Sequence, residues 1–547
     1  MVQHGQMSGQ PVFVLPEGSQ RTLGRDAQRM NIAVAYAVAQ AIKTTLGPRG
    51  MDKMMVSEMG DIVISNDGAT ILGEMNVEHP AAKMMVEIAK TQDEEVGDGT
   101  TTAVVVAGEL FKKAAELIDQ NVHATIIING YKTAAKETID ALQHLSEKVS
   151  IKDRKVLEEI AAISMGSKGV AMGHANDDLA ALVVEAVIKV AEEKDGSFTI
   201  DKDYIKIEKK QGGDVTQTSI INGVLIDKEV VHPGMPKLVP NAKIALVDTA
   251  LEIEKTETDA RININSPEQM TAFLQQEEKM LKEMVDKVQK SGATVLFCQK
   301  GIDDVAQHYL SKAGILAARR VKKSDMEKLV RATGARIVTT LDDLSKNDLG
   351  FAGVVEQRKL GGEQMVFVEQ CKVPKAVTLL VRGGSEHVID EAERAIVDAI
   401  GSVSSAITDG KYVYGGGAIE MELSLALKKK ATKVGGREQL AMQAFAEALE
   451  VIPRTLAESC GLDPIDTLVS LRARHEKGEK TVGVDVLGCK VSDMKPLHVI
   501  EPEKVKKQAI NSASEVVEMI LRIDDIIAAR GRPAMPPGGM GGMGDMD

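Results

Sequence analysis

Residues 95–110, EVGDGTTTAVVVAGEL, place a glycine-rich turn directly before an apolar run. Gly97-Asp98-Gly99 indicates the turn, and the apolar periodicity that follows predicts a helix over Thr101–Leu117. Glycines let a backbone come close to an anion, and the free N–H groups of a helix start attract phosphate. Thr100-Thr101-Thr102 adds three hydroxyl donors at the same point. The stretch therefore predicts an anion site where a helix begins.

The charge of Asp98 leaves two interpretations open. A carboxylate beside bare phosphate is repelled, but it fits if Mg²⁺ lies between them, because hard cations take carboxylate oxygens. The alternative is an ordinary capped helix in which Asp98 is a turn residue.

Two further glycine-rich loops could bring backbone close to the same anion. Thr45-Leu46-Gly47-Pro48-Arg49-Gly50 lies between a predicted helix and a predicted hairpin with strands Lys53–Val56 and Asp61–Ile64. Gly415-Gly416-Gly417-Ala418 precedes a helix that begins near Ile419, and its alternative role is a tight strand-to-helix turn.

Common catalytic motifs are missing from the sequence. Gly166-Ser167-Lys168-Gly169 lacks the spacing and the hydroxyl of a P-loop, and no HExxH or GxSxG occurs. Gly97-Asp98-Gly99 also lacks the third glycine of a dinucleotide fingerprint. A P-loop NTPase, a zinc protease and an α/β-hydrolase are therefore disfavoured.

The composition predicts a multi-domain globular protein that does not bind nucleic acid. The chain has 547 residues, which suggests about three or four domains at roughly 150 residues each. Lys and Arg number 67 against 80 Asp and Glu, a formal charge of −13. This acidic balance disfavours neutralisation of nucleic-acid phosphates. With eight Phe, six Tyr and no Trp, the chain also has few aromatic side chains on which bases could stack.

The sequence also predicts a cytoplasmic protein with no membrane partner. No apolar run reaches the length of about 18 residues that spans a bilayer, and residues 1–13 show no secretory signal. Cys298, Cys371, Cys460 and Cys489 are scattered without a CxxC pair, so we expect buried, reduced thiols.

Helical patterns dominate both ends of the chain, whereas strands and helices alternate in the middle, from about Lys243 to Leu341. The middle pattern is α/β. Helices are predicted towards the ends at Thr22–Leu46, Thr101–Leu117, His387–Ser405, Ile419–Lys430, Arg437–Ser459 and Glu503–Ala529. In the middle, strands are predicted at Ile244–Val247, Thr294–Cys298 and Ile315–Ala318, and helices at Asp303–Ala313 and Ser324–Thr333.

One predicted helix in the middle carries strong start signals and a long apolar stripe. Ser266-Pro267-Glu268-Gln269 reads as an N-cap, a proline at the first helical position and a capping-box glutamine. An ordinary amphipathic core helix is the simplest interpretation. The stripe comprises Met270, Phe273, Leu274, Leu281, Met284, Val285 and Val288.

The last 17 residues, 531–547, hold six Gly and four Met and cannot build a packed core. They are expected to form a flexible tail, either a plain chain end or a soft Met-rich surface for unfolded apolar chains.

Several of these motifs occur together in one protein family. The strings TLGPRGMDKM (45–54), SNDGATIL (65–72), EVGDGTTTAVVVAGEL (95–110) and VYGGGAIEMEL (413–423) resemble the group II chaperonins. These are the archaeal thermosome subunits and their relative, the eukaryotic cytosolic chaperonin. The resemblance runs through essentially the whole chain, including residues 448–466 and 521–529.

The resemblance implies a multi-domain α+β and α/β fold with three domains, two of them discontinuous. A mainly helical equatorial ATPase domain would comprise residues 1–151 and 411–530, and a small intermediate hinge domain 152–221 and 376–410. An α/β apical domain, 222–375, would bind substrate, with a helical lid protrusion around 251–290. Met270, Phe273 and Leu274 could then contact neighbouring lids or substrate.

The resemblance also implies two catalytic carboxylates. Asp67, in SNDGAT, resembles a carboxylate near the attacking water. Asp398, in ERAIVDAI, resembles a second one that the intermediate domain delivers, so that hydrolysis waits for domain closure. Without the resemblance, Asp398 would be interpreted as an exposed helix residue.

Other residues resemble the family's nucleotide contacts. Asp98 resembles the Mg²⁺ ligand, Lys168 a lysine that senses the γ-phosphate, and Glu501 an acidic residue at the ribose, where relatives often have Asp. The remaining implied contacts are Thr45, Leu46, Gly47, Pro48, Gly99, Thr100, Thr101, Thr102 and Gly416.

The implied function is a chaperone that uses Mg·ATP to enclose and fold non-native proteins. Self or paralogous subunits would form two stacked rings of roughly eight or nine, by resemblance, and no separate co-chaperonin lid is expected. The alternatives are a non-catalytic ring that binds nucleotide but only holds its clients and, more distantly, a small-molecule kinase.

Overall fold

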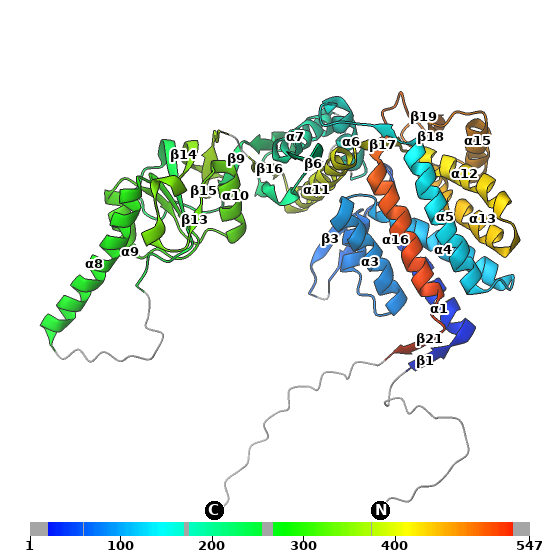
Figure 1. Cartoon of the computed structure of the whole chain (residues 1–547), viewed down its shortest axis with the longest axis horizontal. Coiled ribbons are helices and arrows are strands. Elements are labelled where there is room, and N and C mark those ends of the chain that lie inside the picture. Colours follow the sequence, from blue (N-terminus) through cyan, green and yellow to red (C-terminus); the bar gives the residue numbers. More distant parts are fainter. Residues whose placement is uncertain (1–19, 58, 169–173, 254–265, 373–374, 529–547) are drawn as a thin grey trace, which may run out of the picture.

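The computed structural model describes residues 20–57, 59–168, 174–253, 266–372 and 375–528. Three parts follow one another along the long axis, with the α/β part and helix α8 (Pro267–Ser291) at one end and a mainly helical part at the other (Figure 1). The ribbon of β1 (Gln20–Leu23) and β21 (Asp525–Ala528) projects from the lower side of the helical part in this view. The predicted tail at 531–547 lies outside the described residues. No helix within these ranges combines the length and the apolar character that crossing a membrane requires.

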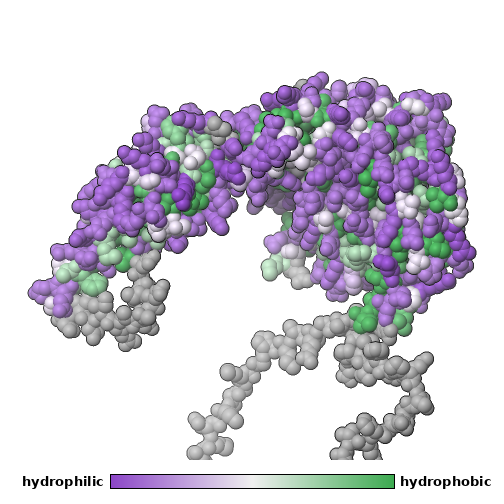
Figure 2. All heavy atoms as spheres, in the orientation of Figure 1, coloured by the Kyte–Doolittle hydropathy of each residue, from purple (hydrophilic) through white to green (hydrophobic). Residues whose placement is uncertain are grey.

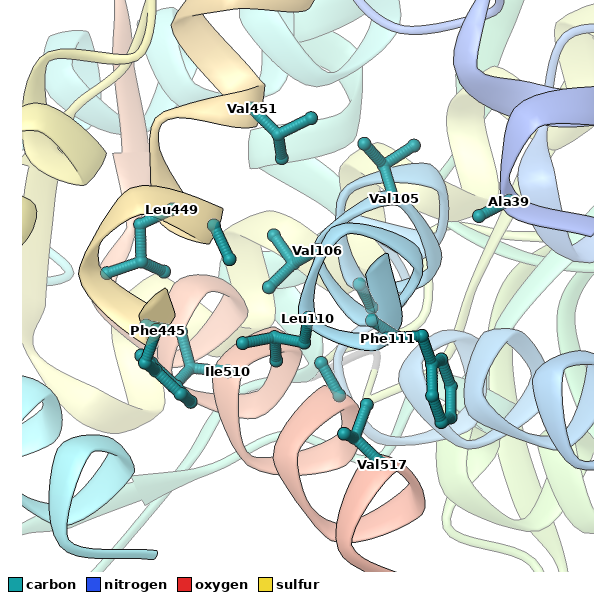
Figure 3. Packing of buried hydrophobic residues seen from close by; sticks show 14 of the residues in the cluster. Ala39, Val105, Val106, Leu110, Phe111, Phe445, Leu449, Val451, Ile510 and Val517 are labelled. Carbon is teal, nitrogen blue, oxygen red and sulfur yellow. The ribbon is translucent and has the colours of Figure 1, made fainter. Parts of the chain in front are cut away.

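The largest part, called here the helical part, is built from both ends of the chain. In its core, α4 packs against α1, α13 and α16, and Val106 and Leu110 of α4 face Phe445 and Ile510 (Figure 3). Its first segment contains β1 (Gln20–Leu23), α1 (Gly24–Lys43), β2 (Lys53–Val56), β3 (Ile62–Ser65), α2 (Gly68–Glu74), α3 (Pro80–Val96), α4 (Thr100–Asp119), α5 (Ala124–Leu145) and β4 (Glu147–Lys148). Its second segment contains β17 (Lys411–Tyr414), α12 (Ala418–Val434), α13 (Gly436–Leu449), α14 (Val451–Ser459), α15 (Pro464–Glu476), β18 (Val482–Asp485), β19 (Lys490–Asp493), β20 (Ile500–Pro502), α16 (Glu503–Leu521) and β21 (Asp525–Ala528).

The middle part, called here the connecting part, is also made of two segments. Strand β16 pairs in parallel with β7 and antiparallel with β8, and helices α6, α7 and α11 share one apolar core beside this sheet. Its elements are α6 (Arg154–Gly166), α7 (His174–Val190), β5 (Glu192–Lys194), β6 (Ser197–Thr199), β7 (Ile205–Gln211), β8 (Ser219–Ile221), β16 (Val377–Gly383) and α11 (Glu386–Asp409).

The α/β part is a single continuous insertion with a seven-stranded mixed sheet. The chain enters it at Asn222-Gly223, where it bends between β8 of one sheet and β9 of the next. Apolar clusters lie on both faces of the sheet. Its elements are β9 (Gly223–Ile226), β10 (Leu238–Val247), α8 (Pro267–Ser291), β11 (Val295–Cys298), α9 (Asp304–Lys312), β12 (Leu316–Ala318), α10 (Lys323–Thr333), β13 (Ile337–Val338), β14 (Gly350–Leu360) and β15 (Glu363–Glu369).

The apolar stripe that the sequence predicts on α8 is buried in one half of the helix and exposed in the other. Ser266 accepts a hydrogen bond from the Gln269 N–H, as the N-cap prediction requires. Leu281, Val285 and Val288 are buried, so the C-terminal half is a core helix. The N-terminal half instead exposes its apolar residues, which are Met270, Phe273, Leu274 and Met280.

Two helix predictions at the C-terminal end are wrong in part. The helix predicted over Arg437–Ser459 is interrupted at Glu450, because Pro453 has no N–H to donate to the preceding turn. The helix predicted over Glu503–Ala529 ends at Leu521, and β21 pairs antiparallel with β1. This pairing joins residues about 500 positions apart, which a local periodicity cannot detect.

The surface is mainly hydrophilic, with apolar residues gathered near the β1–β21 ribbon (Figure 2). The expectation of buried cysteines is confirmed for Cys298 and Cys371, whereas Cys460 and Cys489 are only half-buried. All four are free thiols, and burial raises the pKa of Cys298 to about 11.

Candidate active site

The site begins at the N-terminus of α4, where two glycines shape the chain. Gly97 and Gly99 have positive φ angles of 73° and 77°, which suit glycine. Gly99 is the N-cap of α4 and provides no side-chain acceptor, so the first N–H groups of the helix keep their capacity for an anion. Thr100 and Thr101 are buried here and Thr102 is half-buried.

The N-terminus of α2 lies directly beside that of α4. A Cβ atom on Gly68 would come within 2.8 Å of the Thr101 hydroxyl, which shows how closely the two helix starts approach. Asp67 is the N-cap of α2 and accepts hydrogen bonds from the Thr70 N–H and hydroxyl, both at 2.8 Å. The Thr100 hydroxyl donates to the other oxygen of Asp67 at 3.1 Å.

One buried lysine joins Asp67 to Asp398. The Lys168 Nζ atom lies 2.5 Å from Asp398 Oδ2 and 3.8 Å from Asp67 Oδ1, and all three side chains are at most 10% exposed. The alternative interpretation of Asp398 as an exposed helix residue is therefore wrong. Residues of α2, α6 and α11 meet at this point, although they are up to 331 positions apart in the sequence.

The two carboxylates have pKa values displaced in opposite directions. Burial raises the pKa of Asp398 well above its usual range, and the nearby Asp67 and Asp98 charges add to the rise although Lys168 opposes it. Burial acts the same way on Asp67, but Lys168 and the bonds from Thr70 and Thr100 outweigh it and lower its pKa. The pKa of Lys168 is raised because these carboxylates overcome the effect of burial.

Asp98 is held by both its own turn and the connecting part. Its Oδ1 atom accepts the Gly99 N–H at 2.6 Å, as expected of a turn residue. Its Oδ2 atom accepts the hydroxyls of Ser164 at 2.6 Å and Ser402 at 2.9 Å. Helix α11 reaches this turn because Gly401 contacts it, where a Cβ atom would lie 2.7 Å from the Gly97 Cα.

The loop at residues 45–50 lies on one side of this cluster. The Thr45 hydroxyl is 3.4 Å from that of Thr101, and Gly47 has a positive φ of 82° and packs against Leu456. Leu46 is half-buried and Pro48 is exposed.

Gly416 lies in the loop after β17, and Glu501 lies on β20, which pairs with β17. A Cβ atom on Gly415 would come within 2.5 Å of Glu501 Oε1, so the triple-glycine loop runs directly over this carboxylate. Lys506 lies 2.7 Å from Glu501 and 2.8 Å from Glu420. Burial and the Glu420 charge raise the pKa of Glu501, although Lys506 opposes the rise.

Gln92 joins the turn at Asp98 to Val505 on α16. It is one of several site residues that sequence reasoning missed. Its Nε2 atom donates to the Asp98 carbonyl at 2.8 Å and to the Val505 carbonyl at 3.1 Å. Ser164 and Ser402 were missed too, although each lies four positions from a predicted site residue, Lys168 or Asp398. For Ser402 this spacing means one face of α11 and was the available signal, whereas Lys168 lies just beyond the end of α6, which carries Ser164.

Within the described ranges, no three His, Cys, Asp or Glu residues are placed to hold a metal ion by themselves. Mg²⁺ bound with a nucleotide needs only one or two carboxylates, because phosphate oxygens and water complete its shell. The partly exposed Asp98, beside an uncapped helix start, fits that donor set.

Comparisons with known proteins agree on one family. A sequence model of the TCP-1/cpn60 chaperonin family matches residues 38–531. Thermosome subunits beta and alpha of Archaeoglobus fulgidus are 59% and 58% identical to this chain, with 99% of each chain covered in both cases. The solved structure of an open state monomer of a group II chaperonin from Methanococcoides burtonii is 46% identical. It has a TM-score of 0.59 and covers 78% of this chain and 100% of its own.

Proposed function

The chain belongs to the TCP-1/cpn60 chaperonin family and is an ATP-dependent chaperone that folds proteins in a ring cavity, and we propose that the cluster around Lys168 is its ATP-hydrolysing centre. The observation that carries this proposal is the meeting of Asp67, Asp98 and Asp398 around one buried lysine at two helix N-termini.

The start of α4 binds the nucleotide phosphates in this proposal. Its uncapped N–H groups and the hydroxyls of Thr101 and Thr102 supply donors, and the Thr100 hydroxyl joins them by turning from Asp67 to the phosphates. The Thr45–Pro48 loop and Gly416 enclose the nucleotide. Glu501 accepts from the ribose. Asp98 holds Mg²⁺, which neutralises charge on the phosphate oxygens.

Asp67 and Asp398 have different tasks because their pKa values differ. Asp67 stays ionised and orients the attacking water through the lone pair of Oδ1 that Thr100 does not occupy. Asp398, with its raised pKa, is the stronger base and accepts the proton from that water. Lys168 turns from the carboxylates to the γ-phosphate. Since α6 and α11 carry Lys168 and Asp398, hydrolysis depends on how these helices dock.

The three parts correspond to the predicted domains in this proposal. The helical part is the equatorial ATPase domain (1–151 and 411–530), the connecting part the intermediate hinge (152–221 and 376–410), and the α/β part the apical domain (222–375). Helix α8 belongs to a built-in lid, supported by its exposed apolar half.

Assembly is part of the proposed activity, because one subunit encloses nothing. Stacked rings of this chain with itself or a paralogue would form the cavity for non-native clients. The relatives from Archaeoglobus fulgidus are named as alpha and beta subunits, which supports mixed rings. The free thiols support a reducing, cytoplasmic location.

The Asp398→Ala variant tests the proposal. Removal of the base should lower ATP turnover by about 10²-fold or more and leave ATP binding intact. Asp390→Ala is the matched control, because Asp390 lies on the same helix but pairs with Lys209 at the surface. Unchanged turnover in Asp398→Ala rejects its role, and a wild-type chain that binds ATP without hydrolysing it favours the holding scaffold.

A further inference from the structure

The hydrogen bonds on Asp98 restrict how this carboxylate can bind a cation. An ionised carboxylate has about four lone-pair sites, two on each oxygen. The hydroxyls of Ser164 and Ser402 occupy both sites of Oδ2, and the Gly99 N–H occupies one site of Oδ1. Among the described residues, these bonds leave one site, on Oδ1, for a metal ion.

The two serines are buried, so their positions are fixed by the packing of the helices that carry them. Ser402 is 0% exposed and Ser164 6%, and their hydroxyls lie 3.5 Å apart. Ser402 lies one helical turn after Asp398 on α11, and Ser164 lies in the last turn of α6, just before Lys168. The close approach of Gly401 to Gly97 fixes the distance of α11 from the Asp98 turn.

We propose that Ser164 and Ser402 are positioning residues that make Asp98 a one-oxygen metal ligand and thereby select Mg²⁺ over Ca²⁺. Mg²⁺ requires a compact octahedral shell of single oxygen ligands, whereas Ca²⁺ accepts more ligands and often takes both oxygens of one carboxylate. Because Oδ2 is tied to two hydroxyls, Asp98 cannot turn to present both oxygens. The inference rests on the proposed function, in which Asp98 holds the metal that accompanies the nucleotide.

The position of the serines adds a consequence for the chaperone cycle. Both belong to the connecting part, whereas Asp98 belongs to the helical part. The metal preference therefore depends on the docking of α6 and α11 against the turn before α4.

The test measures metal-dependent ADP binding by calorimetry in the full-length protein, so that no hydrolysis is needed. ADP affinity is determined with Mg²⁺ and with Ca²⁺ for the wild type, for Ser164→Ala with Ser402→Ala, and for each single variant. We expect the ratio of Mg²⁺-supported to Ca²⁺-supported affinity to fall by roughly tenfold in the double variant, the usual effect of losing partners that orient a metal ligand. Each single variant keeps one hydroxyl and should show a smaller fall.

Ser404→Ala is the matched control, because Ser404 is equally buried on α11 but its hydroxyl has no hydrogen-bond partner among the described residues. A double variant with the same ratio as Ser404→Ala overturns the inference and leaves the proposed function standing. A wild-type protein that binds ADP without any metal dependence overturns both. If the double variant does not fold, unchanged ratios in both single variants overturn the inference.

Discussion

Helices α8 and α11 are the two longest among the described residues, with 25 and 24 residues, and both begin at a serine N-cap. Their surroundings differ. Helix α8 buries apolar residues only along its C-terminal half, and the start of the helix lies in solvent. Helix α11 is buried over most of its length, and its buried face includes the polar residues Asp398, Ser402, Ser404 and Ser405.

The difference separates two ways in which a helix contributes to function. Besides its apolar packing, α8 contacts the rest of the α/β part through Glu278, which accepts a hydrogen bond from Tyr309, and through Lys287, which pairs with Asp342. Met270, Phe273 and Leu274 lie closer to the start of the helix and are exposed, so they can serve a partner outside the chain. The polar residues of α11 instead gain their roles from other parts of the same chain, such as Lys168 and Asp98.

The largest expected effect is the loss of stability when a leucine in the buried half of α8 is truncated, compared with the same change in the exposed half. Leu281→Ala removes a side chain that is 3% exposed and should destabilise the protein by about 2–5 kcal/mol. Leu274→Ala, the same change at a position that is 54% exposed, should cost less than about 0.5 kcal/mol. Urea unfolding of both variants measures the contrast, and equal losses would contradict the division of α8 into a packed half and an exposed half.

These contrasts also explain what the sequence could and could not predict. The capped start of α8 and the β2–β3 hairpin follow from local signals, and they occur close to where the sequence places them. The pairing of β21 with β1 joins residues far apart in the sequence, so a local pattern could not predict it. The break at Glu450 does have a local signal, Pro453, which the apolar periodicity alone did not reveal.

The candidate site shows the same limit. The glycine-rich turn and the three threonines could be assigned to phosphate chemistry from their residue types alone, whereas Asp398 was indicated only by family resemblance. Gln92 and Ser402 resemble ordinary helix residues until the fold brings them to Asp98.

A second prediction tests whether the α11 residues depend on close docking. In Gly401→Ala, the new Cβ atom would lie 2.7 Å from the Gly97 Cα and the Val96 carbonyl oxygen, and neither backbone atom can move aside easily. Displacement of α11 should then lower ATP turnover by about tenfold to 10²-fold, because a shift of about 1 Å at a catalytic group has effects of this size.

Gly384→Ala provides the control for this change, since a Cβ atom there meets nothing within 4 Å. Steady-state hydrolysis at saturating ATP compares the two variants. Full activity in Gly401→Ala would mean that the site tolerates a displaced α11, and it would contradict the comparison with α8.

The smallest expected effect comes from comparing two aspartates that cap helices, one inside the candidate site and one outside it. Asp67 caps α2 within the cluster, whereas Asp303 caps α9 in the α/β part through a local bond from the Val305 N–H.

Because the folded protein lowers the pKa of Asp67, the ionised group stabilises the fold above the usual carboxyl pKa, and this stabilisation is lost as the pH falls through the lowered value. Asp67→Asn keeps the cap and leaves Lys168 paired with Asp398, so it should cost about 1–2 kcal/mol at pH 7 and less near pH 3. Asp303→Asn should show a smaller difference between these pH values. Urea unfolding at both pH values measures the two variants, and a penalty for Asp67→Asn that stays constant with pH would show that its charge does not stabilise the helix junction.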